Sequence, residues 1–394
     1  MAEARELRRA ATKALSPYLG RPTARAAVET LFAQHGISRG QVSDEQIEAL
    51  LHAVGPRLVL LVGASPSMGV AESIRRLKRP SEMDPTTLPA LDIGFGLLAF
   101  AVCAVFLPQL VASDSAVYRQ LLTEPVRLAF GSAIKLASLM AGTWFAFRNG
   151  RLFGPGNSAG RAWYLLSGFL CLWTVGQISL SYHQLILDES SPFPSVADVF
   201  FLAGYPLLVT ALVTFLRAYF ASGLFSGEAR GHVIAAAVAS VLLGAMGAVA
   251  LYPVTSANTP AIEKAINIAY PAVDLVAMVP TFLLIRLASQ LRGGSVFWVW
   301  ALLLNGLIAV ALGDLLYAYF SSFGYERLDP VLDVMFALGY LLVARGTIQQ
   351  YALITRKVAI GADGVASLRP RARSVPVSSD RSERVAADPQ DRGS

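Results

Sequence analysis

Four aspartates lie within strongly apolar segments of the chain, and their chemistry needs an explanation. They are Asp198, Asp274, Asp314 and Asp333. An aspartate at the centre of a membrane helix costs about 2.5 to 3.5 kcal/mol on insertion scales, so such residues usually face the interior of a bundle or a wet cavity. If the apolar segments are membrane spans, all four lie in the outer half of the membrane. They then predict a polar pocket that opens to the extracytoplasmic side.

Tyrosine and histidine side chains are the expected neighbours of these carboxylates. Water, tyrosine hydroxyls or a cationic or polar ligand would satisfy the carboxylate oxygens, with Tyr182 and His183 also near the outer helix ends. His183 would add pH sensitivity near its unperturbed pKa of about 6.5, or would be a solvated loop side chain. The predicted ligand-binding residues are Asp198, Tyr205, Asp274, Asp314, Asp333 and Tyr340.

Structural roles are the alternative for these residues. Asp198 follows Ser195 by three residues, and Asp333 follows Asp329 with Pro330 between, so both can act as first-turn caps. The helix dipole would also favour a carboxylate at these positions.

Asp274 lies too deep in its segment for a capping role. Lys135 has a similar depth in another segment, which predicts a buried Lys135–Asp274 ion pair, either structural or functional. Asp314 can hydrogen-bond Tyr317 or Tyr340, or face a wet cavity.

The composition shows what holds these residues in place. Of the 394 residues, 54% are hydrophobic and only 15% are charged, and mean hydropathy is +0.52, which is typical of a membrane protein. Eight segments approach the ~20 residues that a bilayer requires. They are Leu91–Val111, Val126–Phe147, Ala162–Tyr182, Val196–Arg217, Gly231–Tyr252, Ala265–Leu287, Val296–Phe320 and Leu328–Gly346.

The distribution of charge predicts the topology. The net charge of +6 comes from the two ends of the chain, which argues against a nucleic-acid partner. Basic residues in the membrane region fall on one side of the spans, as with Arg75–Arg79, Arg148, Arg161 and Arg292, while the opposite loops are acidic or balanced. The positive-inside rule therefore places both termini in the cytoplasm.

Three regions follow from this pattern. Residues 1–80 are expected to form a small cytoplasmic helical domain, with a capping box of Ser43 and Gln46. Gly63–Gly69 lacks the Gly-Lys-Ser/Thr of a phosphate loop and is expected to join helices, and Arg75–Arg79 is expected to favour the anionic inner leaflet. Residues 81–350 form the eight-span membrane domain, and 351–394 a disordered cytoplasmic tail. The expected fold class is all-α, a polytopic membrane helix bundle.

An internal repeat indicates how the bundle is built. Asp198-Val-Phe-Phe201-Leu-Ala-Gly204-Tyr205 matches Asp333-Val-Met-Phe336-Ala-Leu-Gly339-Tyr340, with Asp, Phe, Gly and Tyr at identical offsets. We therefore expect tandem helical hairpins, related about an axis near the membrane normal. Small residues at Ser240, Gly244 and Ala248 permit close packing of the fifth span, within the bundle or in a homodimer.

Several of these motifs resemble a known signalling region. Pro194-Ser-Val-Ala-Asp198, Ala269-Tyr270-Pro271-Ala-Val-Asp274 and Gly313-Asp314-Leu-Leu-Tyr317 are similar to the multi-span N-terminal membrane sensor region of bacterial diguanylate cyclases and related GGDEF/EAL proteins. The resemblance covers roughly residues 163–346 and implies an input module in the bacterial cytoplasmic membrane. No GGDEF motif or EAL catalytic domain follows the spans, so we expect no cyclase activity from this polypeptide. Gly313–Leu316 is also similar to a motif of lysoplasmalogenase-like membrane hydrolases, although the histidine expected downstream is replaced by Tyr340.

Three functional classes are consistent with these features. We expect a sensory or regulatory membrane protein that binds a small signal from the extracytoplasmic side and changes contacts of residues 1–80 with a signalling partner. A transporter or channel for a proton-coupled or cationic solute is the second class, and a lipid-directed hydrolase using Asp198 and Asp314 is the third. The two cysteines lie in apolar runs and three of the four histidines lie in or beside cytoplasmic segments. We therefore expect no metal site and no cofactor.

Overall fold

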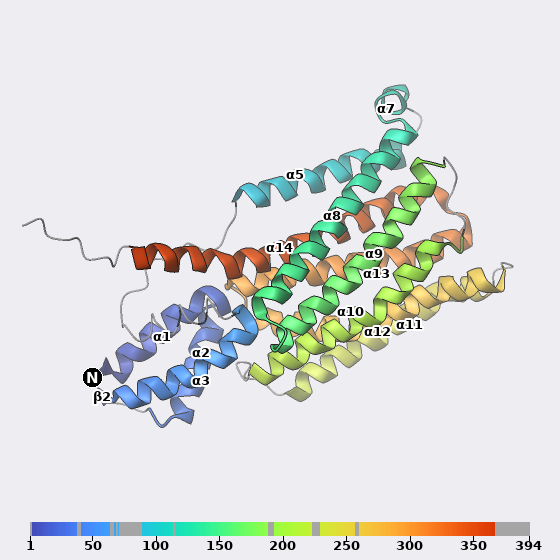
Figure 1. Cartoon of the computed structure of the whole chain (residues 1–394). Helices are drawn as coiled ribbons and strands as arrows, with labels where there is room; N and C mark the ends of the chain where they lie inside the picture. The colour runs from blue at the N-terminus through green and yellow to red at the C-terminus, as the bar shows by residue number, and fades with distance from the viewer. Residues whose placement is uncertain are drawn as a thin grey trace, which may run out of the picture.

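The computed structural model of the chain describes residues 2–37, 41–63, 67, 70, 89–112, 115–187, 193–222, 229–256 and 260–366. Almost all of these residues are helical (Figure 1). A single short ladder, in which β1 (Ala2–Glu3) pairs antiparallel with β2 (Gln41–Val42), is the strand structure of the described part. The sequence prediction of a helical fold is confirmed in these regions.

Eight helical segments of the described chain are long and apolar enough to cross a bilayer. They correspond to the eight predicted spans. The segments are α5 (Pro89–Phe106) with α6 (Gln109–Ala112), α8 (Glu124–Phe153), α9 (Ser158–Leu185), α10 (Val196–Ser222), α11 (Ala229–Ser256), α12 (Ala261–Gln290), α13 (Ser295–Phe323) and α14 (Asp329–Ala366). Apolar side chains on the outside of the bundle, such as Leu97 at 64% and Phe100 at 71% exposure, are suited to lipid contact. The chain is therefore a multi-pass membrane protein.

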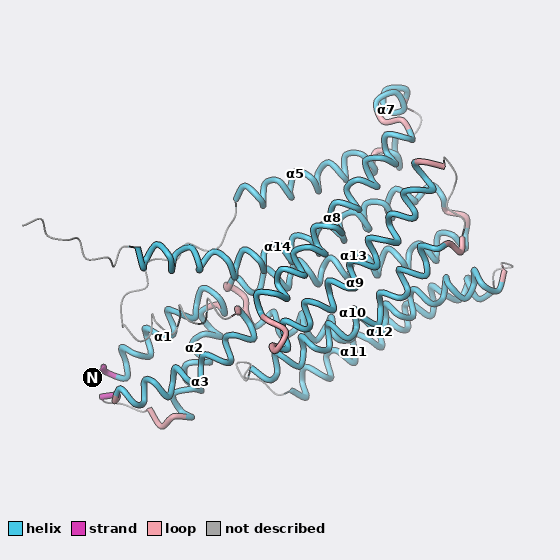
Figure 2. The backbone as a smooth tube through the Cα atoms, viewed as in Figure 1, coloured by secondary structure: helices cyan, strands magenta, loops and turns pink. Residues whose placement is uncertain are grey.

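The spans pack as a closed ring with two outer helices. Neighbouring helices in the ring are α8, α9, α10, α12, α13 and α14, and α14 returns to contact α8. Outside this ring, α5 lies along α14 and α8, and α11 lies against α12 and α13 (Figure 2). The short α7 (Ala116–Leu121) precedes α8, and the 3-10 turn η1 (Glu326–Leu328) precedes α14.

Glycines bring neighbouring spans together in two hairpins. A side chain at Gly176 of α9 would lie 2.9 Å from the Phe201 ring of α10, and one at Gly313 of α13 would lie 2.9 Å from the Phe336 ring of α14. The absent side chains let each phenylalanine ring rest directly on the facing helix. The two hairpins are therefore closed by the same kind of contact at corresponding residues.

Outer helices are attached by different means. Asp92 of α5 accepts a hydrogen bond and ion pair from Arg345 of α14, whose side chain is 5% exposed and also contacts Gln349. Gly244 of α11 faces Leu275 of α12 at ordinary packing distance. Of the small residues predicted to permit close packing of the fifth span, Gly244 is thus in contact within this chain.

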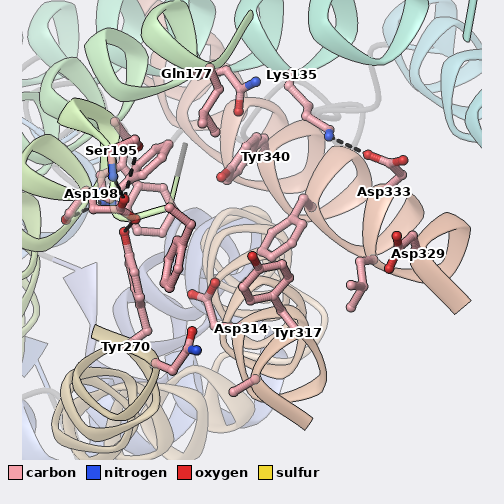
Figure 3. Close-up of a pocket in the computed structure, with 18 of the residues that line it drawn as sticks. Lys135, Gln177, Ser195, Asp198, Tyr270, Asp314, Tyr317, Asp329, Asp333 and Tyr340 are labelled. Atoms are coloured by element: carbon pink, nitrogen blue, oxygen red, sulfur yellow. Dashed lines mark hydrogen bonds and ion pairs between the residues drawn. The ribbon is translucent and has the colours of Figure 1, made fainter. Parts of the chain in front are cut away.

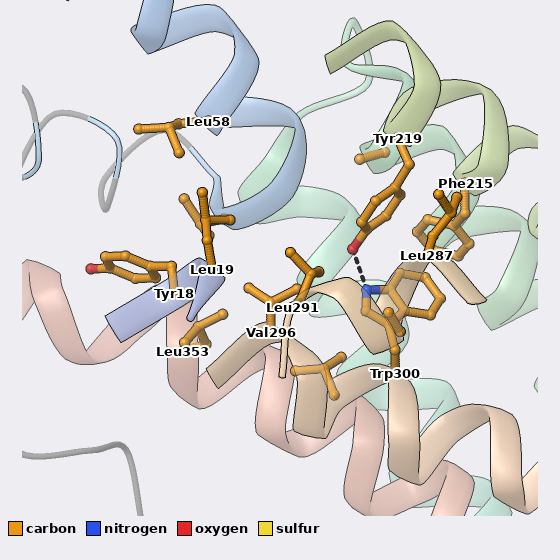
Figure 4. Packing of buried hydrophobic residues seen from close by; sticks show 14 of the residues in the cluster. Tyr18, Leu19, Leu58, Phe215, Tyr219, Leu287, Leu291, Val296, Trp300 and Leu353 are labelled. Carbon is orange, nitrogen blue, oxygen red and sulfur yellow. Dashed lines mark hydrogen bonds between the residues drawn. The ribbon is translucent and has the colours of Figure 1, made fainter. Parts of the chain in front are cut away.

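The N-terminal helices dock on one end of the ring. They are α1 (Ala4–Leu19), α2 (Arg21–Gln34) and α3 (Asp44–Val62). The predicted capping box is confirmed, because the Ser43 hydroxyl accepts from the Gln46 N–H at 3.2 Å and the Gln46 side chain accepts from the Ser43 N–H at 3.1 Å. Their buried side chains join one hydrophobic cluster with those of the spans, including Leu19, Leu58 and Leu291 (Figure 4).

The turn between α12 and α13 carries much of this docking. Thr23 of α2 donates to the Gln290 carbonyl, and Ser295 donates to the Pro17 carbonyl at 2.9 Å. Gly20, with φ +78°, lies so close to the Arg292 carbonyl that a Cβ would collide with it. Nearby, burial raises the pKa of the Tyr18 phenol well above its ordinary value, so this side chain stays neutral.

The last helix extends further than the sequence analysis predicts. The expected tail was placed from residue 351, but α14 continues to Ala366, because no proline or glycine cap ends the helix at 350. Most of the Gly63–Gly69 loop and the basic cluster Arg75–Arg79 lie outside the described residues.

Candidate functional site

A cavity of about 530 Å³ lies at the end of the ring opposite the N-terminal helices. It is formed where α9 and α13 end and where α10, α12 and α14 begin, with Lys135 of α8 at its edge (Figure 3). Its polar and charged lining residues are Lys135, Gln177, Gln184, Ser195, Asp198, Asn267, Tyr270, Asp314, Tyr317, Asp329, Asp333 and Tyr340. The volume falls within the roughly 300–1,000 Å³ of typical small-molecule sites.

Asp198 is held by three donors at the start of α10. Its Oδ2 accepts from the Ser195 N–H at 2.6 Å and from the Ser195 hydroxyl at 3.0 Å. Its Oδ1 accepts from the Tyr270 hydroxyl at 2.9 Å, which ties α10 to α12. The first-turn capping geometry is therefore present, and the same carboxylate also lines the cavity.

Lys135 pairs with Asp333 and not with Asp274. The Lys135 ammonium lies 2.6 Å from Asp333 Oδ1, and the lysine side chain is 15% exposed. The predicted Lys135–Asp274 pair is thus wrong. Depth alone suggested it, but α8 borders α9 and α14 in the ring while α12 lies among α10, α11 and α13.

Tyr205 connects two carboxyl groups below the cavity. Its hydroxyl donates to Asp274 Oδ1 at 2.7 Å and lies 3.2 Å from Asp314 Oδ2. Asp314 lines the cavity, whereas Asp274 is only 7% exposed and is in side-chain contact with Asp314 as well as with Tyr205. We call Asp274, Tyr205 and Asp314 the carboxyl cluster.

Aromatic side chains hold the carboxyl cluster in place. The Trp173 ring makes edge contacts with Tyr205 and Tyr340, each with 5.7 Å between ring centroids. Its indole N–H donates to the Phe201 carbonyl at 3.0 Å, which orients the ring. Tyr205 is 2% exposed and Tyr340 is 6% exposed, so the tyrosines have little freedom to turn away.

Most of the expected site residues meet around this cavity. Asp198, Asp314, Asp333 and Tyr340 line it, and Tyr205 and Asp274 lie directly behind Asp314. Asp314 hydrogen-bonds Tyr205 rather than the expected Tyr317 or Tyr340. Two suggested neighbours lie elsewhere: Tyr182 is 51% exposed, and neither it nor His183 belongs to the lining.

Sequence reasoning missed several lining residues. Gln177 and Gln184 lie on α9. On α12, Tyr270 lies about one turn before Asp274 and Asn267 about two turns before it. Tyr270 immediately precedes Pro271 in the motif that contains Asp274, so its place on the same helix was readable. Gln177, which is 5% exposed, follows Gly176 as Asp314 follows Gly313, so the internal repeat carried the signal for its place at the cavity.

The chemistry available at this site is that of recognition by carboxylates, amides and aromatic rings. In the described part of the chain, no group of three or more His, Cys, Asp or Glu side chains is arranged to hold a metal ion. Both oxygens of Asp198 already accept hydrogen bonds. The lining carboxylate of Asp314 has no cationic partner among the described ion pairs and is suited to a positively charged or hydrogen-bonding solute.

No family model matches the chain, and no curated protein and no solved structure gives a significant match.

Proposed function

We propose that the protein is a membrane receptor or regulatory protein that binds a small polar solute in the cavity and passes the signal to its N-terminal helices. One observation carries the proposal: the cavity and the docked helices lie at opposite ends of the same ring of spans. A ligand that changes the packing at one end can therefore change the docking at the other through shared helices.

Two helices connect the ends directly. The first part of α12 supplies Asn267 and Tyr270 to the cavity, and its end at Gln290 accepts the hydrogen bond from Thr23. α10 begins at the cavity and contacts α3 further along. Within α12, Pro271 and Pro280 lack the N–H that would bond the preceding turn, so this helix contains two points at which bending is easiest.

The proposed orientation follows from charge. Arg151, Arg161, Arg217 and Arg292 lie at the end that carries α1 to α3, whereas Glu124, Glu263 and Asp329 lie at the cavity end. The positive-inside rule then places the N-terminal helices and both termini in the cytoplasm, with the cavity open to the other side. The resemblance to bacterial sensor regions supports a bacterial inner membrane and an output to a cytoplasmic partner through residues 1–80.

The internal repeat is part of the same proposal. We take the α9–α10, α11–α12 and α13–α14 hairpins as tandem copies of one unit, with the first pair of spans as a more divergent pair. The matching Gly176–Phe201 and Gly313–Phe336 contacts support it. In the α9–α10 and α13–α14 hairpins the second helix carries an aspartate near its start, Asp198 in α10 and Asp333 in α14. The cavity lies where these two helix starts come together.

Hydrogen–deuterium exchange of the full chain in nanodiscs tests the proposal. A panel of small polar solutes and amines is screened for a shift in melting temperature, and exchange is then measured with each solute that produces one. We expect slower exchange around the cavity together with altered exchange in residues 17–24 and 290–296. A solute that protects the cavity but leaves the docking segments unchanged would contradict the receptor proposal.

A blocking variant and a matched control make the assignment specific. Leu180→Trp introduces a larger side chain into the cavity wall and should remove both changes. Ile178→Trp, on the same helix but 51% exposed on its outer surface, should leave them intact. Solute flux into proteoliposomes that is lost in Asp274→Asn would instead support a transporter. The buried carboxyl cluster behind the cavity favours this second function, because carboxyl groups within a membrane can relay protons or cations.

A further inference from the structure

The cavity lining has an excess of negative charge. The lining contains the aspartates Asp198, Asp314 and Asp333 and one lysine, Lys135, which is paired with Asp333. Asp329 also lines the cavity and has a contact of its own. Charges that lie away from bulk water interact more strongly than exposed ones. The lining therefore favours a ligand that brings positive charge.

The aromatic lining indicates what kind of cation fits. Trp173, Phe193, Phe201, Tyr317 and Phe336 all contribute to the cavity surface. The faces of such rings attract organic cations and provide apolar contact for carbon groups around the charge. The described residues lack the three-ligand cluster that a metal ion would need, so an alkylammonium group suits this surface better than a bare metal ion.

The contacts of the carboxyl cluster call for one more hydrogen than the Tyr205 hydroxyl supplies. The Tyr205 hydroxyl has one hydrogen but two carboxyl partners, at 2.7 Å and 3.2 Å. If that hydrogen bonds Asp274, the contact with Asp314 is a full hydrogen bond only when Asp314 carries a proton and donates it to the phenol oxygen. No ion pair in the described chain reaches Asp274 or Asp314. A proton held in the cluster removes one of two costly buried charges.

We propose that the cavity binds a small organic cation whose ammonium group takes its place at Asp314 and displaces the proton held by the carboxyl cluster. The O–H bond of Asp314 breaks and the proton passes to water in the cavity. The ligand's positive charge replaces that of the proton, so the net charge of the site is unchanged. The proposal rests on the proposed function, because it takes the cavity as the ligand site.

Other ionisable groups surround the carboxyl cluster and have assigned partners or positions. Asp198 is held by Ser195 and Tyr270, and Lys135 pairs with Asp333. The side chains that α9 contributes to the lining, such as Gln177, do not titrate. The ionisable groups facing the cavity are Lys135 from α8, Asp198 from α10, Tyr270 from α12, Asp314 and Tyr317 from α13, and Asp329, Asp333 and Tyr340 from α14.

Calorimetry with benzyltrimethylammonium tests the ligand and the exchange together. This probe is charged at every pH, and neopentylbenzene is its neutral isostere. Titrations of the nanodisc-embedded full chain in two buffers of different ionisation enthalpy count the protons released. We expect binding of the cation but not of the isostere, release of about one proton per cation, and an affinity that rises up to about tenfold per pH unit. Equal binding of the isostere, or binding without proton release, would overturn the proposal.

Infrared spectroscopy tests the proton without any ligand. A protonated carboxyl group has a distinct C=O band, which should be present in the wild-type protein at neutral pH and decrease when the probe cation binds. Asp314→Asn and Asp274→Asn should each remove it, while Asp333→Asn, at the cavity wall but outside the cluster, should retain it. If these variants do not fold, the wild-type spectrum alone decides, since absence of the band excludes a held proton.

The outcomes separate this inference from the proposed function. If another polar solute binds in the cavity and alters exchange in residues 17–24 and 290–296, and Leu180→Trp blocks both effects, the receptor proposal stands. If the cation in the same experiments neither binds nor releases a proton, the cation exchange is wrong. If no solute binds but the infrared band is present in the wild-type protein and absent in Asp314→Asn, the carboxyl cluster holds a proton, the receptor proposal fails, and the cation exchange fails with it.

Discussion

At the scale of single residues, the four intramembrane aspartates have different environments despite their similar sequence contexts. Asp198 has three hydrogen-bond donors and Asp333 has an ammonium partner, so both carboxylates stabilise contacts between helices. Asp274 and Asp314 share one hydroxyl, contact each other, and have no cationic partner among the described ion pairs. Two carboxyl groups buried together without a cation are costly, so the second pair lowers stability where the first pair adds to it.

Asparagine substitutions should distinguish these two kinds of aspartate. Asp198→Asn removes a charged acceptor from the Ser195 N–H and Tyr270 hydroxyl, and should lower the free energy of unfolding by about 0.5–2 kcal/mol. Asp314→Asn resembles the protonated acid in shape and charge, and should leave stability unchanged or increased. Melting temperatures in nanodiscs measure both. A large loss of stability in Asp314→Asn would show that this carboxylate acts mainly as a structural group.

At the scale of elements, the docking of α1 and α2 depends on close backbone approach. Gly20 has a positive φ, and the position that a Cβ would occupy is already filled by the Arg292 carbonyl in the α12–α13 turn. Gly36 also has a positive φ, of +64°, but nothing lies within 4 Å of the place a Cβ would occupy. The two glycines therefore share a positive φ, which would strain any other residue, and differ in packing.

Alanine at these positions should separate strain from docking. Gly36→Ala should cost roughly 1–2 kcal/mol for the left-handed backbone and leave the N-terminal helices docked. Gly20→Ala should add a collision with Arg292 and increase hydrogen exchange at residues 17–24 and 290–296. Similar exchange in the two variants would indicate that the docking surface tolerates the added methyl group.

At the scale of the whole molecule, local patterns were readable from the sequence and ring order was not. The eight spans and the Ser43 capping box follow from composition and short spacings, and the structure contains both. The partner of Lys135 depends on which helices are neighbours, which is set by packing between residues as distant as 135 and 333. The contribution of Asn267 to the cavity was missed for the same reason, since an uncharged polar side chain does not reveal which way its helix faces.

Accessibility to a membrane-impermeant thiol reagent tests the orientation on which the receptor proposal depends. Cys103 and Cys171 are first replaced by alanine, because Cys171 is exposed on the bundle surface. In intact cells, Gln184→Cys at the cavity should react from outside, and Arg151→Cys at the opposite end should react only after the membrane is made permeable. The reason is the basic excess at the end that carries Arg151, Arg161 and Arg217, since such residues are retained on the cytoplasmic side. The reverse labelling pattern would place the cavity in the cytoplasm and the N-terminal helices outside, so any ligand would then be an intracellular solute.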